Sequence, residues 1–522
     1  MPLTDLLAVV ALTAAVGSAV WVLARPHRKP YAVGLLSLFC LLAGLALAGG
    51  SAWARPDLHL LPLVLAAVAL IPIWIIARGF GRVDLMAIAI HAGLGMKGAT
   101  LKGYENEIVS ALIVVSVAGL GFWGLHTILD TGAWLLWVGA LVLVALNPVV
   151  RHVVSRLLHP TIKADLLAAL HPPGPSQEPQ DPPDLVVIYL EGMDRRFFDT
   201  ATFGDLVAPL AALESEGLSF DGVRQIAGTG WSLAGMVASL SGVPVLPNGT
   251  RGHNKLGGIA HFMPTIPSLG DVLAAQGYAM EYVVGADPRF AGIDVYYRTH
   301  GIGVIGRDEQ IAMHPPDDAA AARIDRMLDD QMTFDSARLR QQALGQTAAP
   351  YMLVVETVGP HGRTGYLSRR ATADGRGTKS RDARAVIRSL VDETARFVAD
   401  IRAQQARLRP GRPLRIALMS DHLSHNINLP RGGADFAGRN MVILLGGAVG
   451  SVVREGAMID VYPTLLEWLG FAGPGAAANL GRSLLSPAPT LVEQFGVATL
   501  DRILTSDGAL AARLWSGTEP QP

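Results

Sequence analysis

Five long apolar segments in the first 150 residues constrain the fold of this chain more than any other feature. Each is close to the roughly 20 residues that an α-helix needs to cross a bilayer. Tryptophans lie in or beside them, as is typical of membrane interfaces. One such segment could belong to a soluble helical core, but five in series predict a transmembrane domain over residues 1–150. The segments span residues 3–24, 31–50, 57–77, 108–128 and 132–150.

Two parts of this region need separate interpretation. The first segment lacks a basic amino-terminal stretch, which favours a membrane anchor over a cleaved signal peptide. Residues 81–107 mix apolar, charged and glycine residues. They are expected to be either a segment lying at the headgroup level or a plain connecting loop.

Composition limits the chemistry that the rest of the chain can perform. Hydrophobic residues make up 50% of the 522 residues, and the formal net charge is −1, so we expect no nucleic-acid partner. Cys40 is the single cysteine, which excludes an intramolecular disulfide and a cysteine-based metal site. Any metal ion must therefore be held by oxygen and nitrogen ligands.

A proline-rich linker separates the apolar region from a second region of different character. Residues 151–183 form the juxtamembrane segment and linker, in which 171–183 is dense in proline and predicts a stiff spacer. Beyond it, β-branched runs alternate with helical patterns, which predicts an α/β domain with a mostly parallel sheet flanked by helices. The expected strands are 184–191, 280–285, 351–356, 414–419 and 440–445, and the expected helices include 266–277, 382–406 and 460–469.

Residues 228–242 predict a loop that turns into an apolar helix at Ser232. The free N–H groups and partial positive charge of a helix N-terminus suit a phosphate oxyanion. A serine at this place can be a nucleophile, a metal ligand or both. Alternatively, Ser232 is an ordinary N-cap that closes the loop.

Polar groups follow several of the expected strands. Because ligands bind at the carboxyl ends of strands in open α/β sheets, these groups are candidates for one site. Carboxylates, an imidazole and a hydroxyl together suit Mn²⁺, Mg²⁺ or Zn²⁺. The groups are Glu191, the Ser420-Asp421-His422 run, His361 after the 351–356 strand, and Asp287 with Arg289 after the 280–285 strand.

These pieces together resemble the alkaline phosphatase/sulfatase superfamily, and within it the phosphoglycerol transferases, which include lipoteichoic acid synthase. The resemblance covers residues 184–485, in family order, and implies a sulfatase-like catalytic domain there. Residues 486–522 form a C-terminal tail, in which the pattern from Leu491 to Trp515 predicts an amphipathic helix. The matching runs are Tyr189-Leu-Glu191, Gly228 to Ser239, Gly285-Ala-Asp-Pro-Arg-Phe-Ala-Gly292, Tyr297-Arg-Thr-His-Gly301, Ser420-Asp-His-Leu423 and Leu480-Gly-Arg-Ser483.

The resemblance implies a role for each matching residue. Glu191, Ser232, Asp421 and His422 would hold one divalent ion, Mn²⁺ or Mg²⁺. Ser232 would attack the phosphorus of phosphatidylglycerol, form a covalent phosphoglycerol intermediate and release diacylglycerol. His361 would contact the substrate phosphate or the leaving group. The remaining expected substrate contacts are Trp231, for which core packing is the alternative, Asp287, Arg289 and His425.

The chain also departs from the family pattern. Serine stands at position 232 where the family usually has threonine, and the glycerol-pocket tryptophan and arginine of lipoteichoic acid synthase are not evident. The run Arg289-Phe-Ala-Gly292 instead resembles the branch that modifies osmoregulated periplasmic glucans, which favours a glucan or other glycan acceptor. The alternatives are a phosphoethanolamine transferase or phosphodiesterase on the same scaffold, and a catalytically silent membrane protein that binds lipid or glycan.

The resemblance and the charge pattern disagree about orientation. Basic residues follow the first and fifth apolar segments, and the positive-inside rule would place both groups, and the domain after residue 150, in the cytoplasm. The family places its catalytic domain outside the cytoplasmic membrane, where lipid headgroup and glycan meet. We expect a multi-pass bacterial inner-membrane protein with a periplasmic catalytic domain. The conflicting residues are Arg25, Arg28, Lys29, Arg151, Arg156 and Lys163.

Overall fold

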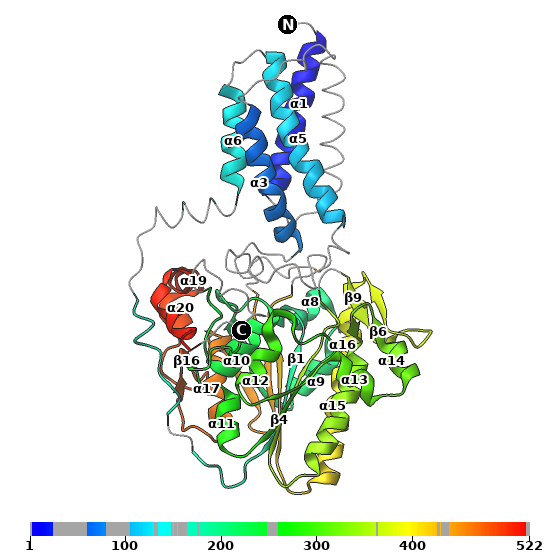
Figure 1. Ribbon diagram of the computed structural model, residues 1–522, viewed down its shortest axis with the longest axis vertical. Helices are drawn as coiled ribbons and strands as arrows, with labels where there is room; N and C mark the ends of the chain where they lie inside the picture. The colour runs from blue at the N-terminus through cyan, green and yellow to red at the C-terminus, as the bar shows by residue number, and fades with distance from the viewer. Residues whose placement is uncertain are drawn as a thin grey trace. The chain divides into compact units, whose positions relative to one another are not determined.

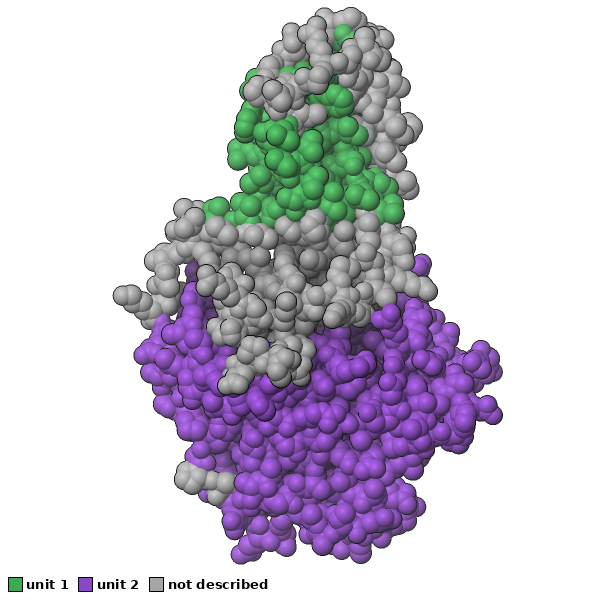
Figure 2. Space-filling model, viewed as in Figure 1, with its two compact units in different colours: residues 1–85, 99–161 green, residues 86–98, 162–522 purple. Residues whose placement is uncertain are grey.

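The structure is a computed structural model of the full chain. It describes residues 3–24, 60–79, 105–129, 134–147, 150, 154, 164–174, 177–247, 259–361, 364–424, 429 and 438–517. The expected apolar segment 31–50, most of the 81–107 segment and His425 therefore lie outside the described residues. The chain divides into two compact units, one comprising residues 1–85 and 99–161 and the other residues 86–98 and 162–522 (Figure 2).

The first unit contains four described apolar helices, which coincide with four of the five expected segments (Figure 1). Its interior is built from small and aliphatic side chains such as Leu12, Ala111 and Leu136. Many large apolar side chains instead point outward, including Trp137, which is 52% exposed, and Leu141, which is 68% exposed. The helices are α1 (Leu3–Ala24), α3 (Leu60–Gly79), α5 (Glu105–Leu129) and α6 (Trp134–Leu146).

One stretch among the described residues, Val109–Leu129 in α5, is long and apolar enough to cross a membrane by length and composition. The apolar stretches described in α1, α3 and α6 are shorter than this measure requires. The number of spans expected from the sequence, five, therefore stays a prediction.

The second unit is organised around an eight-stranded sheet whose order is β13-β2-β12-β11-β1-β8-β4-β5. The run from β11 to β5 is parallel throughout, and β12 is antiparallel to both of its neighbours. A mostly parallel sheet is thus confirmed. The strands are β1 (Asp184–Leu190), β2 (Gly217–Phe220), β4 (Ala279–Val284), β5 (Gly303–Ile305), β8 (Tyr351–Glu356), β11 (Leu414–Ser420), β12 (Val442–Leu445) and β13 (Gly450–Val452).

Side chains of the central strand β1 alternate between two apolar cores, as the period of a strand requires. Val187 and Tyr189 enter the core on one face, and Ile188 and Leu190 enter the core on the other. Both faces are covered, which is why β1 is a nearly continuous apolar run. One core contains α10 (Ser232–Ser241), α11 (Leu269–Ala275), α12 (Ile293–Thr299) and α17 (Met458–Leu469); the other contains α9 (Ala208–Glu214), α15 (Asp330–Gly345) and α16 (Ala383–Leu408).

Short elements complete the unit. They are η2 (Arg195–Phe198), α8 (Thr200–Phe203), β3 (Val223–Arg224), η4 (Phe290–Gly292), α13 (Arg307–Met313), α14 (Pro316–Ala322), β6 (Arg323–Ile324), β7 (Met327–Leu328), β9 (Gly365–Leu367), η5 (Arg369–Ala371), β10 (Thr378–Ser380), β14 (Gly456–Ala457), β15 (Ala477–Ala478) and β16 (Gly481–Arg482).

The C-terminal tail differs from the single amphipathic helix that the sequence suggests over Leu491 to Trp515. It forms three short helices, α18 (Leu491–Phe495), α19 (Val497–Ser506) and α20 (Gly508–Leu514). Gly496, at φ +68°, ends the first helix, and Asp507 ends the second and caps the third through Leu510 N–H. Leu500, Ile503 and Leu514 nevertheless pack into the core, so the apolar periodicity was informative.

Candidate active site

Parallel pairing brings the predicted site residues to one edge of the sheet. Leu190, the last residue of β1, pairs with Ser420, the last residue of β11. Glu191 and Asp421 therefore leave adjacent strands at the same level. On the other side of β1, Tyr189 pairs with Glu356, the last residue of β8. The carboxyl ends of three neighbouring strands thus deliver three acidic groups to one place.

Glu191, Ser232, Asp421 and His422 meet there, and we refer to them as the four-residue cluster. His422 Nε2 lies 3.2 Å from Glu191 Oε1 and 3.3 Å from Asp421 Oδ2. The Ser232 hydroxyl donates to Glu191 Oε2 at 3.4 Å. The three ionisable residues are almost completely buried. Ligand atoms of Glu191, Asp421 and His422 all lie within 4.8 Å of one another, as metal ligands would.

Ser232 is not the N-cap of its helix. The cap is Trp231, whose extended backbone makes no side-chain capping bond, and Ser232 is the first helical residue. Its hydroxyl therefore faces Glu191 instead of satisfying the helix N–H groups. The first turn of α10 keeps backbone N–H groups directed beyond its end, which suits an anionic phosphate.

Two details of the cluster fit a divalent cation. The His422 Nδ1–H can donate to the Leu423 carbonyl at 2.8 Å, which directs the lone pair of Nε2 toward the two carboxylates. Asp421 Oδ1 accepts from the backbone N–H groups of Gly192 and His422 at 2.9 and 2.8 Å. Asp421 Oδ2 is buried, and no described residue donates a hydrogen bond to it. Two carboxylates, an imidazole and a hydroxyl form a ligand set suited to Mn²⁺, Mg²⁺ or Zn²⁺.

The electrostatics of the cluster also favour a cation. Burial raises the pKa of Asp421 to about 6, and the Glu191 carboxylate adds to the rise. Burial alone would lower the pKa of His422, but Asp421 and Glu191 raise it to about 10. The imidazolium thus offsets part of the negative charge. A divalent ion would replace that proton and compensate the carboxylates more completely.

A glycine sets how closely α10 approaches the end of β11. A Cβ at Gly235 would lie 1.6 Å from the carbonyl oxygen of Asp421. Any side chain there would push α10 away from the end of β11. Gly235 is one turn after Ser232, so this contact determines how near the Ser232 hydroxyl comes to the cluster.

Glu356 is a buried acid beside the cluster to which the sequence analysis gave no role. It is 4% exposed, and Tyr282 donates its hydroxyl to Glu356 Oε2. Burial raises the pKa of Glu356 to about 8; the tyrosine bond opposes the rise, and the Asp421 and Glu191 carboxylates add to it. The sequence feature that could have identified Glu356 is its position as the last residue of a buried strand.

The raised pKa of Glu356 predicts a pH-dependent cost to stability. In the unfolded chain Glu356 ionises near its ordinary pKa of 4.5, whereas in the folded protein it ionises near 8. Stability is therefore lost as pH rises from about 4.5 to about 8. Glu356→Gln keeps an acceptor for Tyr282 and removes this ionisation. We expect it to unfold at a higher temperature than the parent at pH 8.5, by an amount corresponding to about 2–4 kcal/mol, and at nearly the same temperature at pH 5.

Thermal unfolding of the full chain in detergent with a chelator measures this difference, because bound metal would mask it. Glu281→Gln is the control, since Glu281 pairs with Arg340 away from the cluster. A stability gain from Glu356→Gln that is equal at both pH values would contradict the assignment.

Two further polar side chains hold the cluster in place and were also missed from the sequence. Gln225 accepts a hydrogen bond from Leu423 N–H at 2.9 Å, which ties the segment after His422 to the loop before Ser232. Thr357 accepts a hydrogen bond from Glu191 N–H at 3.1 Å. Each bond joins segments that are far apart in the sequence, and no local pattern predicts them.

The expected substrate residues occupy different settings. Trp231 is half-buried and packs against the core that contains α10, as the alternative interpretation expected. Asp287 and Arg289 follow β4. The Arg289 guanidinium, on a side chain that is 75% exposed, donates two hydrogen bonds to the Asp287 carboxylate, from Nε to Oδ1 at 2.9 Å and from Nη2 to Oδ2 at 2.6 Å. His361 is exposed in the loop after β8 and, within the described chain, makes no side-chain hydrogen bond. Among the described residues, no hydrogen bond or ion pair joins Asp287, Arg289 or His361 to the four-residue cluster.

His300 and Asp460 have structural roles. His300 is buried, and its Nδ1 lies 2.7 Å from Asp271 Oδ2, as expected for a satisfied core histidine. Asp460 is the third residue of α17, not its N-cap, and it accepts bonds from Ala457 and Arg482 N–H at 2.8 Å.

Curated relatives confirm the resemblance to phosphoglycerol transferases. Phosphoglycerol transferase I from Xanthomonas campestris pv. campestris (strain B100) is 30% identical over 353 residues, which are 66% of this chain and 48% of that protein. Phosphoglycerol transferase I from Escherichia coli (strain 55989 / EAEC) is 35% identical over 196 residues, which are 37% of this chain and 25% of that protein. This chain thus spans about half, or less, of these relatives. No protein-family model matches it.

Solved structures with a similar fold have low sequence identity. One is a protein of the alkaline phosphatase superfamily from Vibrio parahaemolyticus, with a TM-score of 0.46 and 18% identity, covering 64% of this chain and 77% of that one. Another is the lipoteichoic acid synthase LtaP from Listeria monocytogenes, with a TM-score of 0.44 and 14% identity, covering 59% of this chain and 76% of that one.

Proposed function

We propose that this chain, a homologue of the phosphoglycerol transferases, is a membrane-anchored, metal-dependent phosphotransferase that moves phosphoglycerol from phosphatidylglycerol to a glycan. The observation that carries the proposal is the position of Ser232. Its hydroxyl lies at the start of α10 and 3.4 Å from Glu191, in a buried group of metal-type ligands. A serine with only a structural role would not have to lie beside a buried set of metal-type ligands.

The chain's own residues account for the two steps of such a transfer. The Ser232 oxygen attacks phosphorus, the bond from phosphorus to the diacylglycerol oxygen breaks, and phosphoglycerol becomes esterified to Ser232. The serine loses its proton and the departing oxygen gains one, for which His361 is the candidate donor. An acceptor hydroxyl then displaces Ser232 by the same bond exchange. The N–H groups at the start of α10 stabilise the phosphate oxygens throughout.

Glu191, Ser232, Asp421 and His422 would hold the ion, which we propose to be Mn²⁺ or Mg²⁺. When bound, it would lower the pKa of the serine hydroxyl and neutralise phosphate charge. His422 would bind through Nε2, because its Nδ1 faces the Leu423 carbonyl. Asp421 would bind through Oδ2, because its Oδ1 accepts two backbone N–H groups.

The first unit supports the membrane anchor. Its helices place large apolar side chains on their outer surfaces, among them Leu7, Val64 and Leu112, each between 44% and 48% exposed. Such surfaces are unfavourable in water and favourable in lipid. We propose a multi-pass inner-membrane protein whose catalytic unit is periplasmic. A glucan-type acceptor is proposed on the resemblance of Arg289-Phe-Ala-Gly292 to the glucan-modifying branch.

Purified full-length protein tests the donor directly. With Mn²⁺ we expect release of diacylglycerol from phosphatidylglycerol at a rate at least about tenfold above that from phosphatidylethanolamine, and no release with a chelator. Faster release from phosphatidylethanolamine would replace the proposal by a phosphoethanolamine transferase. No release from either lipid, with no metal bound, would favour a binding protein.

A further inference from the structure

The loop 357–361, which leaves β8 beside Glu191, is held by an acid from another element. Asp330 Oδ1 accepts from Val358 N–H at 2.7 Å, and its Oδ2 accepts from Gly359 N–H at 3.0 Å. Asp330 is 3% exposed and is the first residue of α15. One carboxylate therefore fixes two consecutive amides of the loop.

The contact is close enough to demand glycine in the loop. A Cβ at Gly359 would lie 2.3 Å from Asp330 Oδ2. The Gly359 carbonyl in turn accepts from Tyr366 N–H at 2.7 Å. Asp330 and Tyr366 thus hold the loop on both sides of its turn, in which His361 N–H bonds the Val358 carbonyl at 3.1 Å.

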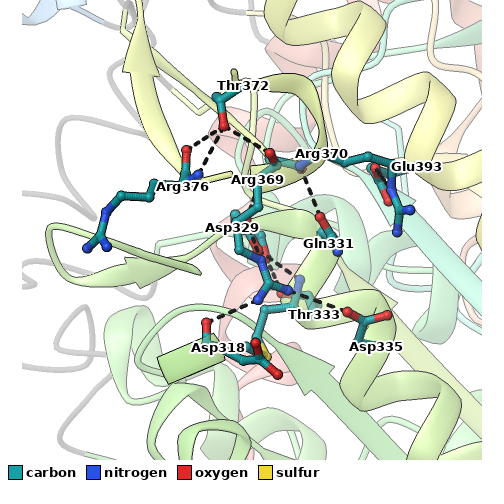
Figure 3. Close-up of polar contacts among 12 residues, drawn as sticks. Asp318, Asp329, Gln331, Thr333, Asp335, Arg369, Arg370, Thr372, Arg376 and Glu393 are labelled. Atoms are coloured by element: carbon teal, nitrogen blue, oxygen red, sulfur yellow. Dashed lines mark hydrogen bonds and ion pairs between the residues drawn. The ribbon is translucent and has the colours of Figure 1, made fainter. Parts of the chain in front are cut away.

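The N-cap residue just before α15, Asp329, holds the region beyond the loop. Asp329 caps the helix through Met332 N–H, and its Oδ2 accepts from Arg369 N–H at 2.8 Å. The Arg369 guanidinium reaches the Asp318 carbonyl and Asp335, so Arg369 is itself fixed (Figure 3). Two neighbouring aspartates therefore hold this region: Asp330 contacts the 357–361 loop, and Asp329 contacts the later segment at Arg369.

The held loop is part of the site and not a distant support. Thr357 Oγ1 accepts from Glu191 N–H, and Thr357 N–H donates to the Tyr189 carbonyl at 3.0 Å. The residues that line a small cavity include Glu191, Pro360 and Gly365. His361, at the end of the loop, has no side-chain partner among the described residues that could fix it. Its position depends on the backbone that Asp330 holds.

We propose that Asp330 is a positioning residue for the transfer reaction, which sets the place of His361 and of the cavity wall relative to Glu191. Within the described chain, the hydrogen bonds of its carboxylate go to loop amides, and Asp330 is not one of the proposed metal ligands. The activity measurements that test this role rest on the proposed function. The structural measurements that test it do not depend on the substrate.

Asp330→Ala and Asp330→Asn in the full-length protein test this role. We expect Asp330→Ala to lower kcat/KM for phosphatidylglycerol about thirtyfold or more, and Asp330→Asn less, since the amide keeps one acceptor oxygen. Mn²⁺ affinity should stay within about twofold, because all proposed ligands lie on other elements. Gly359→Ala disturbs the same contact from the loop side and should reproduce the loss. A large loss of Mn²⁺ affinity in Asp330→Asn would overturn the proposal.

A double-mutant cycle with His361→Ala separates positioning from general destabilisation. If Asp330 acts through the loop, Asp330→Asn should lower kcat/KM by no more than about threefold when it is introduced into the His361→Ala variant. The matched control, Asp507→Ala, removes the cap of α20 and should leave activity unchanged in both backgrounds. Independent, multiplying losses from Asp330→Asn and His361→Ala would overturn the proposal, as would full activity of His361→Ala.

Hydrogen exchange keeps this test independent of the substrate. The amides of Val358 and Gly359 should exchange at least about tenfold faster in Asp330→Asn, while those of β1 and β11 keep their protection. Unchanged exchange at 358–359 would overturn the positioning role even if the lipid assay succeeds. Faster exchange in a protein inactive on phosphatidylglycerol would leave the Asp330 contact established and refute only the proposed substrate.

Discussion

Replacing Ser232 by alanine is expected to lower phosphoglycerol transfer by about a thousandfold or more, because the covalent step loses its attacking atom. The rest of the cluster should survive. Glu191, Asp421 and His422 come from β1 and β11, and their mutual distances do not depend on the hydroxyl. We expect Mn²⁺ affinity to fall by no more than about tenfold.

Mass spectrometry of protein incubated with phosphatidylglycerol would show the phosphoglycerol adduct on Ser232 in the parent and no adduct in Ser232→Ala. Ser232→Thr retains a hydroxyl at the same helix position and should keep substantial activity. Ser241→Ala is the matched control on α10, since the Ser241 hydroxyl contacts Tyr296 instead of the cluster. Transfer by Ser232→Ala above about 1% of the parent rate would eliminate Ser232 as the nucleophile.

Asp421→Asn is expected to remove metal binding, with a loss of affinity of about a hundredfold or more and a matching loss of activity. Asn can keep Oδ1 toward Gly192 and His422 N–H, but it presents an NH₂ group where Oδ2 would bind the ion. Because burial and Glu191 raise the pKa of Asp421 to about 6, the ionised form costs stability in the metal-free protein above that pH. The same substitution also removes the carboxylate that, with Glu191, keeps His422 protonated, so the test rests on Mn²⁺ affinity and activity and not on unfolding temperature.

Asp460→Asn provides the matched control. Asp460 is also fully buried, with a pKa that burial raises to about 7, and it accepts the Ala457 N–H at the start of α17, outside the cluster. It should change thermal stability without changing Mn²⁺ affinity. Calorimetric Mn²⁺ titration distinguishes the two aspartates, and parent-like affinity in Asp421→Asn would refute the proposed ligand set.

The sequence located the sheet and the cluster because both depend on short-range patterns. The apolar runs predicted β1, β4, β8, β11 and β12 with ends that differ by at most two residues from the observed ones. Polar residues directly after such strands must collect at one edge when the strands are parallel. The sequence alone therefore predicts that Glu191 and Asp421 lie together.

Residues that act through distant partners could not be found in this way. Asp330 contacts amides 28 and 29 residues away, and Tyr282 reaches Glu356 across 74 residues. In the sequence Asp330 is an ordinary helix-start acid. Asp287 and Arg289, which were expected at the glycerol pocket, pair with each other at the surface, and their contact with substrate stays a prediction.

The contact between Gly235 and the Asp421 carbonyl determines which features of this enzyme can be redesigned. The separation between the Ser232 hydroxyl and the proposed metal ligands is set where two main chains touch, at Gly235 and the Asp421 carbonyl. Substitutions at Pro360, in the wall of the cavity beside Glu191, therefore leave this main-chain contact in place, whereas any side chain at position 235 would displace α10.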